Sequence, residues 1–135
     1  MFMDLSGGQS PEEVLLVQSW RRKVLSQIWR IIPADELGSY YLVSRDPVRG
    51  GDNRCLEVKL GGLHDQIGLG VITGAKEQQW ELVPADPGYY FIKSKFYPND
   101  QKTINVPGGQ PVEQSLIMFS FWKGNNEQWR FTPAD

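Results

Sequence analysis

Gln27-Ile-Trp-Arg-Ile-Ile-Pro-Ala-Asp35 is the stretch that decides the fold, because the chain contains it three times. It returns as Gln78-Gln-Trp-Glu-Leu-Val-Pro-Ala-Asp86 and again as Glu127-Gln-Trp-Arg-Phe-Thr-Pro-Ala-Asp135. The tryptophans of the three copies are 51 and then 49 residues apart. Self-similarity at a fixed period of this size indicates a fold assembled from repeated units.

Other segments keep the same spacing. Tyr40-Tyr-Leu-Val43 matches Tyr90-Phe-Ile-Lys93, and residues 2–5 match residues 55–58 and 103–106. A Gly-Gly pair follows each of the last three segments, at 7–8, 61–62 and 108–109. Short apolar segments separated by turn residues are typical of strands. Their density, about four in each unit of about 50 residues, favours an all-β barrel or sandwich.

A helix competes with this interpretation near the N-terminus. Ser10-Pro11-Glu12-Glu13 has the features of a helix start, and apolar residues then recur near helical spacing up to residue 30. The second and third copies of the Trp segment are not preceded by such a pattern. We therefore expect strands in this region too, with Ser10 and Pro11 in a loop.

Composition and charge limit the class of protein. The 135 residues are enough for one domain, with an ordinary content of 40% hydrophobic and 22% charged residues. A net charge of −2 argues against nucleic-acid binding, and no apolar run is long enough to cross a membrane. Cys55 is the only cysteine, so neither an intrachain disulfide nor a cysteine-rich metal site is expected. Residues 1–10 lack a signal-peptide pattern, and we expect a soluble, cytoplasmic protein without metal or other cofactor.

The Gln-x-Trp copies, in register with the Gly-Gly pairs, resemble the ricin B-type β-trefoil lectins. Residues 3–8, Met-Asp-Leu-Ser-Gly-Gly, and residues 55–58, Cys-Leu-Glu-Val, are similar to the Cys-Leu-Asp-Val segment of that family. The first of them looks most like the small cytoplasmic lectins of mushrooms. The resemblance implies one β-trefoil domain over 1–135, with repeats at 1–35, 36–86 and 87–135. It also implies a fungal, non-enzymatic protein that binds glycans of the galactose or N-acetylgalactosamine type.

The first repeat is shorter than the other two by about fifteen residues. It lacks the segment that matches Tyr40–Val43, which in a β-trefoil is the first barrel strand of the repeat. We therefore expect one strand fewer than the full set of twelve, with unpaired edges beside Trp29 and Trp129. Proteins normally cover such edges. We expect either that the chain was cut from a longer product or that another copy or segment fills the position.

Candidate sugar sites follow from the resemblance. A sugar presents hydroxyl groups on its rim and an apolar C–H face, so its site needs a carboxylate or amide beside an aromatic wall. The family pattern places the acid in the Cys-Leu-Asp-Val segment, and an aromatic residue and an Asn-Gln pair before the Gln-x-Trp tryptophan. Transferred residue by residue, the pattern gives two carbohydrate-binding groups: Asp4, Trp20 and Gln27 in the first repeat, and Asn105, Phe119 and Asn126 in the third.

No repeat matches the family pattern completely. In the first repeat Trp20 lies one place off register and Ser26 stands where asparagine is expected; in the third, Asn105 replaces the acid and Glu127 replaces glutamine. The second repeat offers Glu57 and Gln78, but Gly70 stands at the aromatic position, so no site is expected there.

Several of these residues also have a structural interpretation. Symmetric tryptophans can fill the interior of a barrel, so we expect Trp29, Trp80 and Trp129 in the core. Gln27 and Gln78 are expected to brace backbone groups whether or not a sugar binds. Cys55 is expected to pack as a small core residue, and the lone His64 to lie in a solvated loop.

The leading hypothesis is a non-enzymatic lectin, in which weak single sites gain strength through multivalency and a homodimer is expected. Its partners would be glycans or glycoproteins. A second hypothesis is a protein-binding trefoil, such as a fungal protease inhibitor, that uses loop 44–54 with Arg45 and Arg49 or loop 94–101 with Lys95. A third is a scaffold module of a larger protein. No repeat contains paired carboxylates or metal ligands, so an enzyme is not expected.

Overall fold

The computed structural model describes residues 2–6, 14–19, 24–48, 51, 53–61, 64–109 and 114–132. Strands dominate this part of the chain, and its only helical elements are single 3-10 turns. The strands are β1 (Phe2–Leu5), β2 (Leu16–Ser19), β3 (Trp29–Pro33), β4 (Tyr40–Ser44), β5 (Arg54–Lys59), β6 (Gln66–Val71), β7 (Trp80–Pro84), β8 (Tyr90–Ser94), β9 (Lys102–Asn105), β10 (Gln114–Ser115), β11 (Ile117–Ser120) and β12 (Gln128–Trp129). The prediction of an all-β fold is confirmed.

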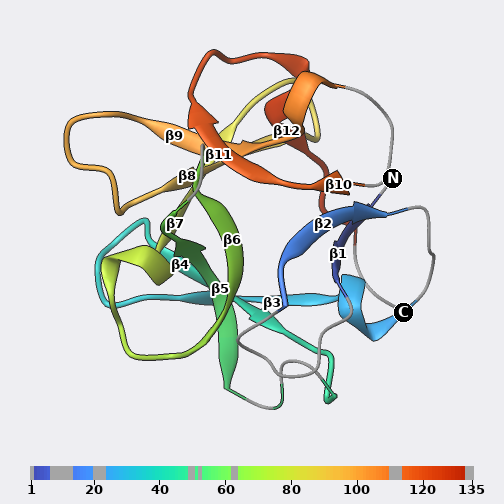
Figure 1. The fold of residues 1–135 in the computed structure, drawn as a ribbon. Helices are drawn as coiled ribbons and strands as arrows, with labels where there is room; N and C mark the ends of the chain where they lie inside the picture. The colour runs from blue at the N-terminus through green and yellow to red at the C-terminus, as the bar shows by residue number, and fades with distance from the viewer. Residues whose placement is uncertain are drawn as a thin grey trace.

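The three repeats are arranged around a common axis (Figure 1). In each repeat a 3-10 turn ends just before the closing strand, so that the Gln-x-Trp segment has the same local structure three times. These turns are η2 (Leu25–Gln27), η3 (Lys76–Gln78) and η5 (Asn125–Glu127); a fourth turn, η4 (Pro107–Gly109), carries the last Gly-Gly pair. This arrangement is the β-trefoil predicted from the repeats.

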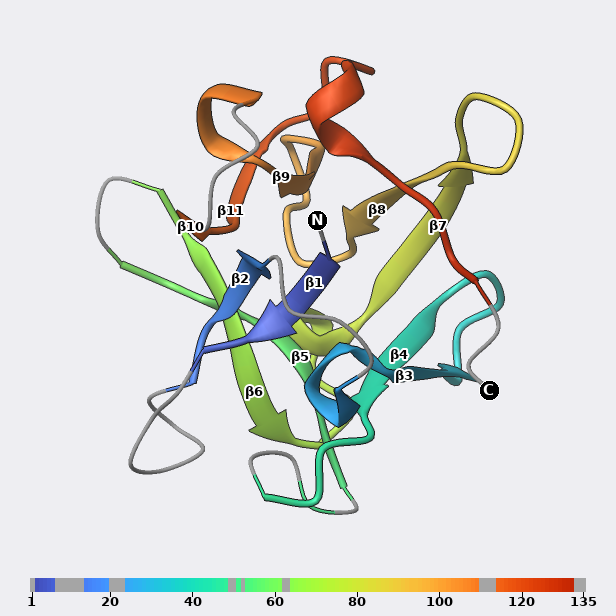
Figure 2. The same ribbon diagram turned by 90° about the vertical axis from the view of Figure 1, so that its right-hand side faces the viewer.

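The helix considered for residues 11–30 is absent from the described part of that segment. Residues 16–19 form β2, which pairs with β1 in an antiparallel hairpin from Phe2↔Ser19 to Leu5↔Leu16 (Figure 2). The loop expected at Ser10 and Pro11 lies outside the described residues. Long-range pairing with β1 has therefore overridden the helical signal of the local sequence.

The third strands of the three repeats meet near the axis. Leu15 bridges to Gly68, β6 pairs with β11, and β10 pairs with β2. Strands β10 and β11 share one position in this pattern, interrupted at Leu116, whose N–H donates to the Leu16 carbonyl oxygen at 3.0 Å. The twelve labelled strands therefore fill eleven positions of the trefoil. The described residues contain no strand at the first position of the first repeat.

The core takes side chains from all three repeats, including Leu5, Leu56 and Ile104 from their second strands. The expectation that the three symmetric tryptophans lie in the core is confirmed in full for Trp80 and only in part for the other two. Trp80 is fully buried, whereas Trp29 and Trp129 are half-buried and pack against the margin of the core. Both flank the position where the described residues provide no strand, which explains why they are less buried than Trp80.

Cys55 is fully buried, as expected for a small core residue. Burial raises the pKa of its thiol to about 12, with a further contribution from the nearby Glu57 charge. The described residues contain no helix that could span a membrane and no group of metal-ligating side chains.

Candidate functional site

Each repeat has one carboxylate and one carboxamide at two matching positions, one in its second strand and one in its Gln-x-Trp segment. In the first repeat Gln27 donates from Nε2 to Oδ2 of Asp4 at 3.2 Å. The Asp4 carboxylate is fully buried, and its Oδ1 also accepts from the Leu5 N–H and the Ser26 hydroxyl. Ser26, which replaces the expected asparagine, thus binds the acid itself.

In the second repeat Gln78 links the acid to the backbone. Its Nε2 donates to Glu57 Oε1 at 2.9 Å and to the Val71 carbonyl oxygen, and its Oε1 accepts from the Thr73 and Gly74 N–H groups. The expected bracing role of Gln78 is therefore present in the structure.

Glu57 also forms an ion pair with Lys59 at 2.7 Å. Burial acts to raise the pKa of Glu57, but hydrogen bonds from Lys59 and Gln78, together with the Lys59 charge, outweigh it and leave the pKa lowered. Both carboxylate oxygens thus have partners within the protein.

Gly70 explains why the second repeat has no aromatic wall. A Cβ at this position would collide with the Glu57 carboxylate, which fills the space in front of it. We expect Gly70→Ala to displace Glu57 from Gln78 and Lys59 and to lower the free energy of unfolding by about 1–3 kcal/mol. Chemical denaturation measures this cost. In a Glu57→Asp background the shorter acid leaves room for the Cβ, so the cost of Gly70→Ala should shrink; an equal cost in both backgrounds would contradict the explanation.

In the third repeat the acid and the amide have exchanged places. Asn105 stands at the acid position, and Glu127, also buried, stands at the amide position. The Glu127 carboxylate accepts from the Trp122 N–H at 3.1 Å, the Gly124 N–H at 2.8 Å and the Thr103 hydroxyl. The exchange preserves one charge and one amide per repeat, as in the other two.

Asn126 lies above this pair, between the third Gly-Gly turn and Gly124. Its Nδ2 donates to Asn105 Oδ1 and to the Val106 carbonyl oxygen, both at 3.2 Å. A Cβ on Gly109 would lie 3.7 Å from the Asn126 Cβ, and one on Gly124 would lie 3.0 Å from its Oδ1. The contact at Gly109 would be an ordinary one, whereas at Gly124 the absence of a side chain lets the chain pass close to the Asn126 amide. Its Oδ1 accepts no hydrogen bond from the described residues and remains available to a ligand.

Two exposed aromatic residues belong to the same repeat. Phe119 pairs across the hairpin with Thr103, so it shares a face with Thr103 and Asn105; it is 39% exposed and contacts the His64 ring edge-on at 5.1 Å. Trp122, which the sequence reasoning did not select, is 74% exposed. Its backbone N–H is bound to Glu127, the residue that follows Asn126.

The turn after Trp122 has a left-handed backbone. Lys123 has φ of 58°, and no other described non-glycine residue has a positive φ. The corresponding residue of the second repeat is Gly74, which adopts such a backbone without strain. A lysine at a glycine position costs about 1 kcal/mol, and such strain tends to be concentrated at functional sites.

The structure brings some of the predicted site residues together. Asp4 contacts Gln27, and Asn105 contacts Asn126 and shares a hairpin face with Phe119. Trp20 lies outside the described residues. The residue in register with Phe119 in the first repeat is Ser19, which is buried, in agreement with the one-place offset of Trp20. Which of these residues bind a sugar stays a prediction.

Of the two loops proposed for protease binding, loop 94–101 contacts another part of the protein through Lys95. Lys95 lies 3.6 Å from Glu36, and Lys102 lies over the Tyr97 ring and 3.9 Å from Asp100. Arg45 is exposed, and Arg49 falls outside the described residues.

The β-trefoil class defined by this fold is also found by comparison with solved structures. A designed 3-fold symmetric protein, ThreeFoil, is 24% identical with a TM-score of 0.79, over 95% of this chain and 87% of that chain. An exo-β-1,3-galactanase from Clostridium thermocellum is 23% identical with a TM-score of 0.78, over 95% of this chain but 26% of that chain. The Haemophilus ducreyi cytolethal distending toxin is 18% identical with a TM-score of 0.60, over 98% of this chain and 83% of that chain. No protein-family model and no curated protein matches the sequence. These likenesses establish the fold.

Proposed function

We propose that this chain is a non-enzymatic carbohydrate-binding protein that acts through its third repeat. One observation carries the proposal: the exposed rings of Phe119 and Trp122 occur in the same repeat as Asn126, whose Oδ1 accepts no hydrogen bond from the described part of the chain. Exposed aromatic rings suit the apolar C–H face of a sugar, and a fixed amide suits its hydroxyl groups.

The buried side chains of Asn105 and Glu127 would hold the Asn126 amide and the turn beside it in place. Asn105 and the Val106 carbonyl oxygen accept from Nδ2 of Asn126, which holds the Asn126 amide in one orientation. Glu127 fixes the backbone at Trp122 and Gly124 on either side of the strained Lys123. A ligand would then bind a preorganised surface with little loss of side-chain entropy.

The first repeat is the weaker candidate. Asp4 has no exposed surface, and Gln27 and Ser26 already donate to its carboxylate. Direct binding of sugar hydroxyls by Asp4 would require these partners to move. Trp20, as the stacking residue of that site, stays a prediction.

Galactose or N-acetylgalactosamine is the ligand class we propose, on the strength of the resemblance to ricin B-type lectins. One of the structural neighbours is an exo-β-1,3-galactanase, an enzyme of galactose-containing glycans, which supports this ligand class. A homodimer belongs to the same proposal, because two weak sites on one particle would crosslink glycoproteins. We also propose a cytoplasmic location, on the strength of the same resemblance.

A glycan array tests the proposal with four proteins: the wild type, Trp122→Ala, Phe119→Ala and Tyr89→Ala. We expect galactosyl glycans to bind, and Trp122→Ala to lose about 2 kcal/mol of binding free energy, or about 30-fold in Kd. Phe119→Ala should lose a comparable part of the affinity. Tyr89 is the matched control, because it is also an aromatic residue with 39% exposure but lies in the turn before β8.

Other results would redirect the proposal. Equal losses in Trp122→Ala and Tyr89→Ala would contradict a site in the third repeat. Binding that survives both third-repeat changes but disappears in Asp4→Ala would move the site to the first repeat. A folded wild type that binds no glycan would overturn the lectin proposal and favour a protein partner, with Arg45 the first residue to change.

A further inference from the structure

The first strand of a repeat occupies a defined position in this fold. In the second repeat β4 pairs with β3 before it, with β5 at Val43↔Cys55 and with the closing strand β7 at Tyr40↔Trp80. In the third repeat β8 pairs in the same way with β7, β9 and β12. By the same symmetry, the position in the first repeat is bordered by β12, β1 and β3.

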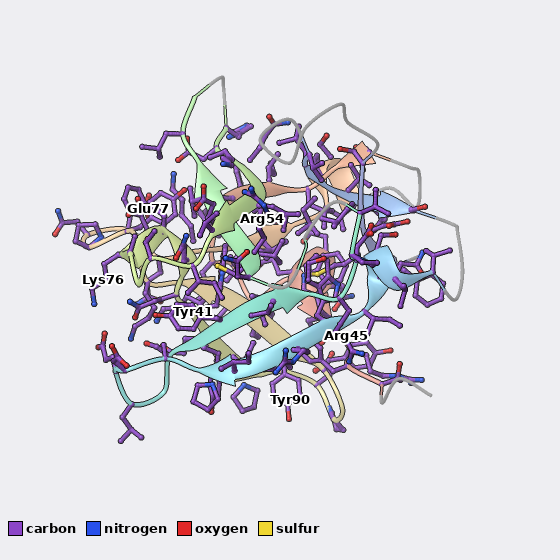
Figure 3. All side chains as sticks on the ribbon, turned by 90° about the horizontal axis from the view of Figure 1, so that it is seen from below. Tyr41, Arg45, Arg54, Lys76, Glu77 and Tyr90 are labelled. Carbon is purple, nitrogen blue, oxygen red and sulfur yellow. The ribbon has the colours of Figure 1, made fainter. Side chains whose placement is uncertain are left out.

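No described strand lies at that position. Among the described residues β3 pairs with β4 alone, and β12 pairs with β8 alone. Figure 3 shows β3 and β4 side by side, seen from below. Unpaired strand edges present free N–H and C=O groups and can accept a further strand.

Phe2 of β1 is more exposed than its equivalents in the other two repeats. Cys55 and Thr103, its equivalents in the other repeats, are both fully buried, but Phe2 is 43% exposed. In those repeats the covering residues are Val43 of β4 and Lys93 of β8, each opposite its partner in the sheet.

The hydrogen bonding of Trp29 also indicates an unfilled strand position. The Trp80 and Trp129 indole N–H groups donate to the carbonyl oxygens of Leu56 and Ile104, both at 3.1 Å. The Trp29 Nε1 is buried and has no hydrogen-bond partner among the described residues. In the second repeat this bond runs from β7 to β5, and β4 pairs with both of these strands. In the first repeat no strand of the described residues pairs with both β1 and β3.

We propose that the position bordered by β12, β1 and β3 is an acceptor site for an extended peptide segment from outside residues 1–135. The two filled positions define the chemistry of that segment: Tyr40-Tyr-Leu-Val-Ser44 and Tyr90-Phe-Ile-Lys-Ser94 share the pattern aromatic, aromatic, aliphatic, variable, serine. Leu42 and Ile92, the aliphatic residues, are buried in the core. The backbone would supply affinity and the aliphatic and aromatic side chains would supply specificity.

A second copy of the same chain does not fit this position. Its only two segments with the required pattern are β4 and β8, and each already forms five cross-strand pairs with the preceding closing strand. A copy that donated one of them would lose those pairs and leave the same defect in itself. The occupant is therefore a separate segment with its own free strand.

A synthetic peptide that copies residues 88–95, Gly-Tyr-Tyr-Phe-Ile-Lys-Ser-Lys, tests the site when added to the full chain. At ten times its Kd, a ligand of the folded state raises the Tm of a domain of this size by about 5 °C. We expect this rise to saturate with peptide concentration, and hydrogen exchange of the β3 and β12 amides to slow. The same peptide with Ile92→Pro should have no effect, because proline cannot sit within a paired strand.

A protein variant locates the bound peptide. Phe2→Lys places a charge opposite the lysine at position 93 of the peptide, and like charges in that arrangement weaken a strand pair. We expect at least tenfold weaker peptide binding, with no loss in the fully exposed Leu37→Lys control. No Tm shift with the peptide would overturn the proposal. The proposal would also be overturned if, without peptide, hydrogen exchange of the β3 and β12 amides slowed as the protein concentration rose, since a second copy would then occupy the site. Neither result depends on glycan binding.

Discussion

Trp80→Ala should lower the free energy of unfolding by about 3–5 kcal/mol, as expected for removal of a fully buried large aromatic side chain. The Trp80 side chain has no exposed surface, and its indole N–H is bound to the Leu56 carbonyl oxygen at 3.1 Å. The change leaves a cavity at the centre of the core and an unpaired carbonyl group. Such a loss approaches the whole stability of an ordinary domain, so Tm should fall by about 10–15 °C. Thermal and urea unfolding followed by far-UV circular dichroism measures the effect.

Trp29→Ala is the matched control for this prediction. Trp29 occupies the same position of its repeat, but it is half-buried and its N–H has no partner among the described residues. Its removal should cost about 1–2 kcal/mol, because less apolar surface and no hydrogen bond are lost. Equal costs for the two variants would show that the first repeat is as well packed as the second, and would contradict the open position beside Trp29.

Much of the fold could be predicted from the spacing of the repeats. Three copies of Gln-x-Trp in register with Gly-Gly pairs outweighed the helical pattern after Pro11, and β2 confirmed that choice. The short first repeat also indicated the strand position that the described residues leave unfilled. These features depend on which backbone segments pair, and the spacing of the repeats along the sequence indicates that pairing.

The site could be predicted less well, because exposure depends on packing. Asp4 matches the family acid, but its burial follows from Ser26 and Gln27, whose contacts a residue pattern does not reveal. Trp122 was overlooked because it stands outside the family aromatic position. A signal was available: it precedes Lys123 at a turn where the second repeat has a glycine. An aromatic residue beside a turn with backbone strain is therefore a candidate for a binding site.

Asn105→Asp should be the most costly change in the third repeat, at about 3 kcal/mol or more. Asn105 is buried, and its Nδ2 donates to both the carbonyl oxygen and the hydroxyl of Thr103, at 3.1 and 2.9 Å. An aspartate would bring an acceptor against that carbonyl oxygen. It would also add a second negative charge to the network that contains Glu127. Urea denaturation of the single variant measures the cost.

A second change should rescue this variant, because the other repeats already contain the reversed pair. In Asn105→Asp/Glu127→Gln the acid and the amide return to the places of Glu57 and Gln78, where the amide donates to the acid and accepts from two backbone N–H groups. We expect the double variant to be about 2 kcal/mol more stable than the sum of the single changes predicts. If the losses of the two single variants simply add up in the double variant, the third repeat does not contain the same acid–amide pair in exchanged positions. A stabilising coupling would mean that each repeat keeps one acid and one amide at these two positions, whichever position carries the acid.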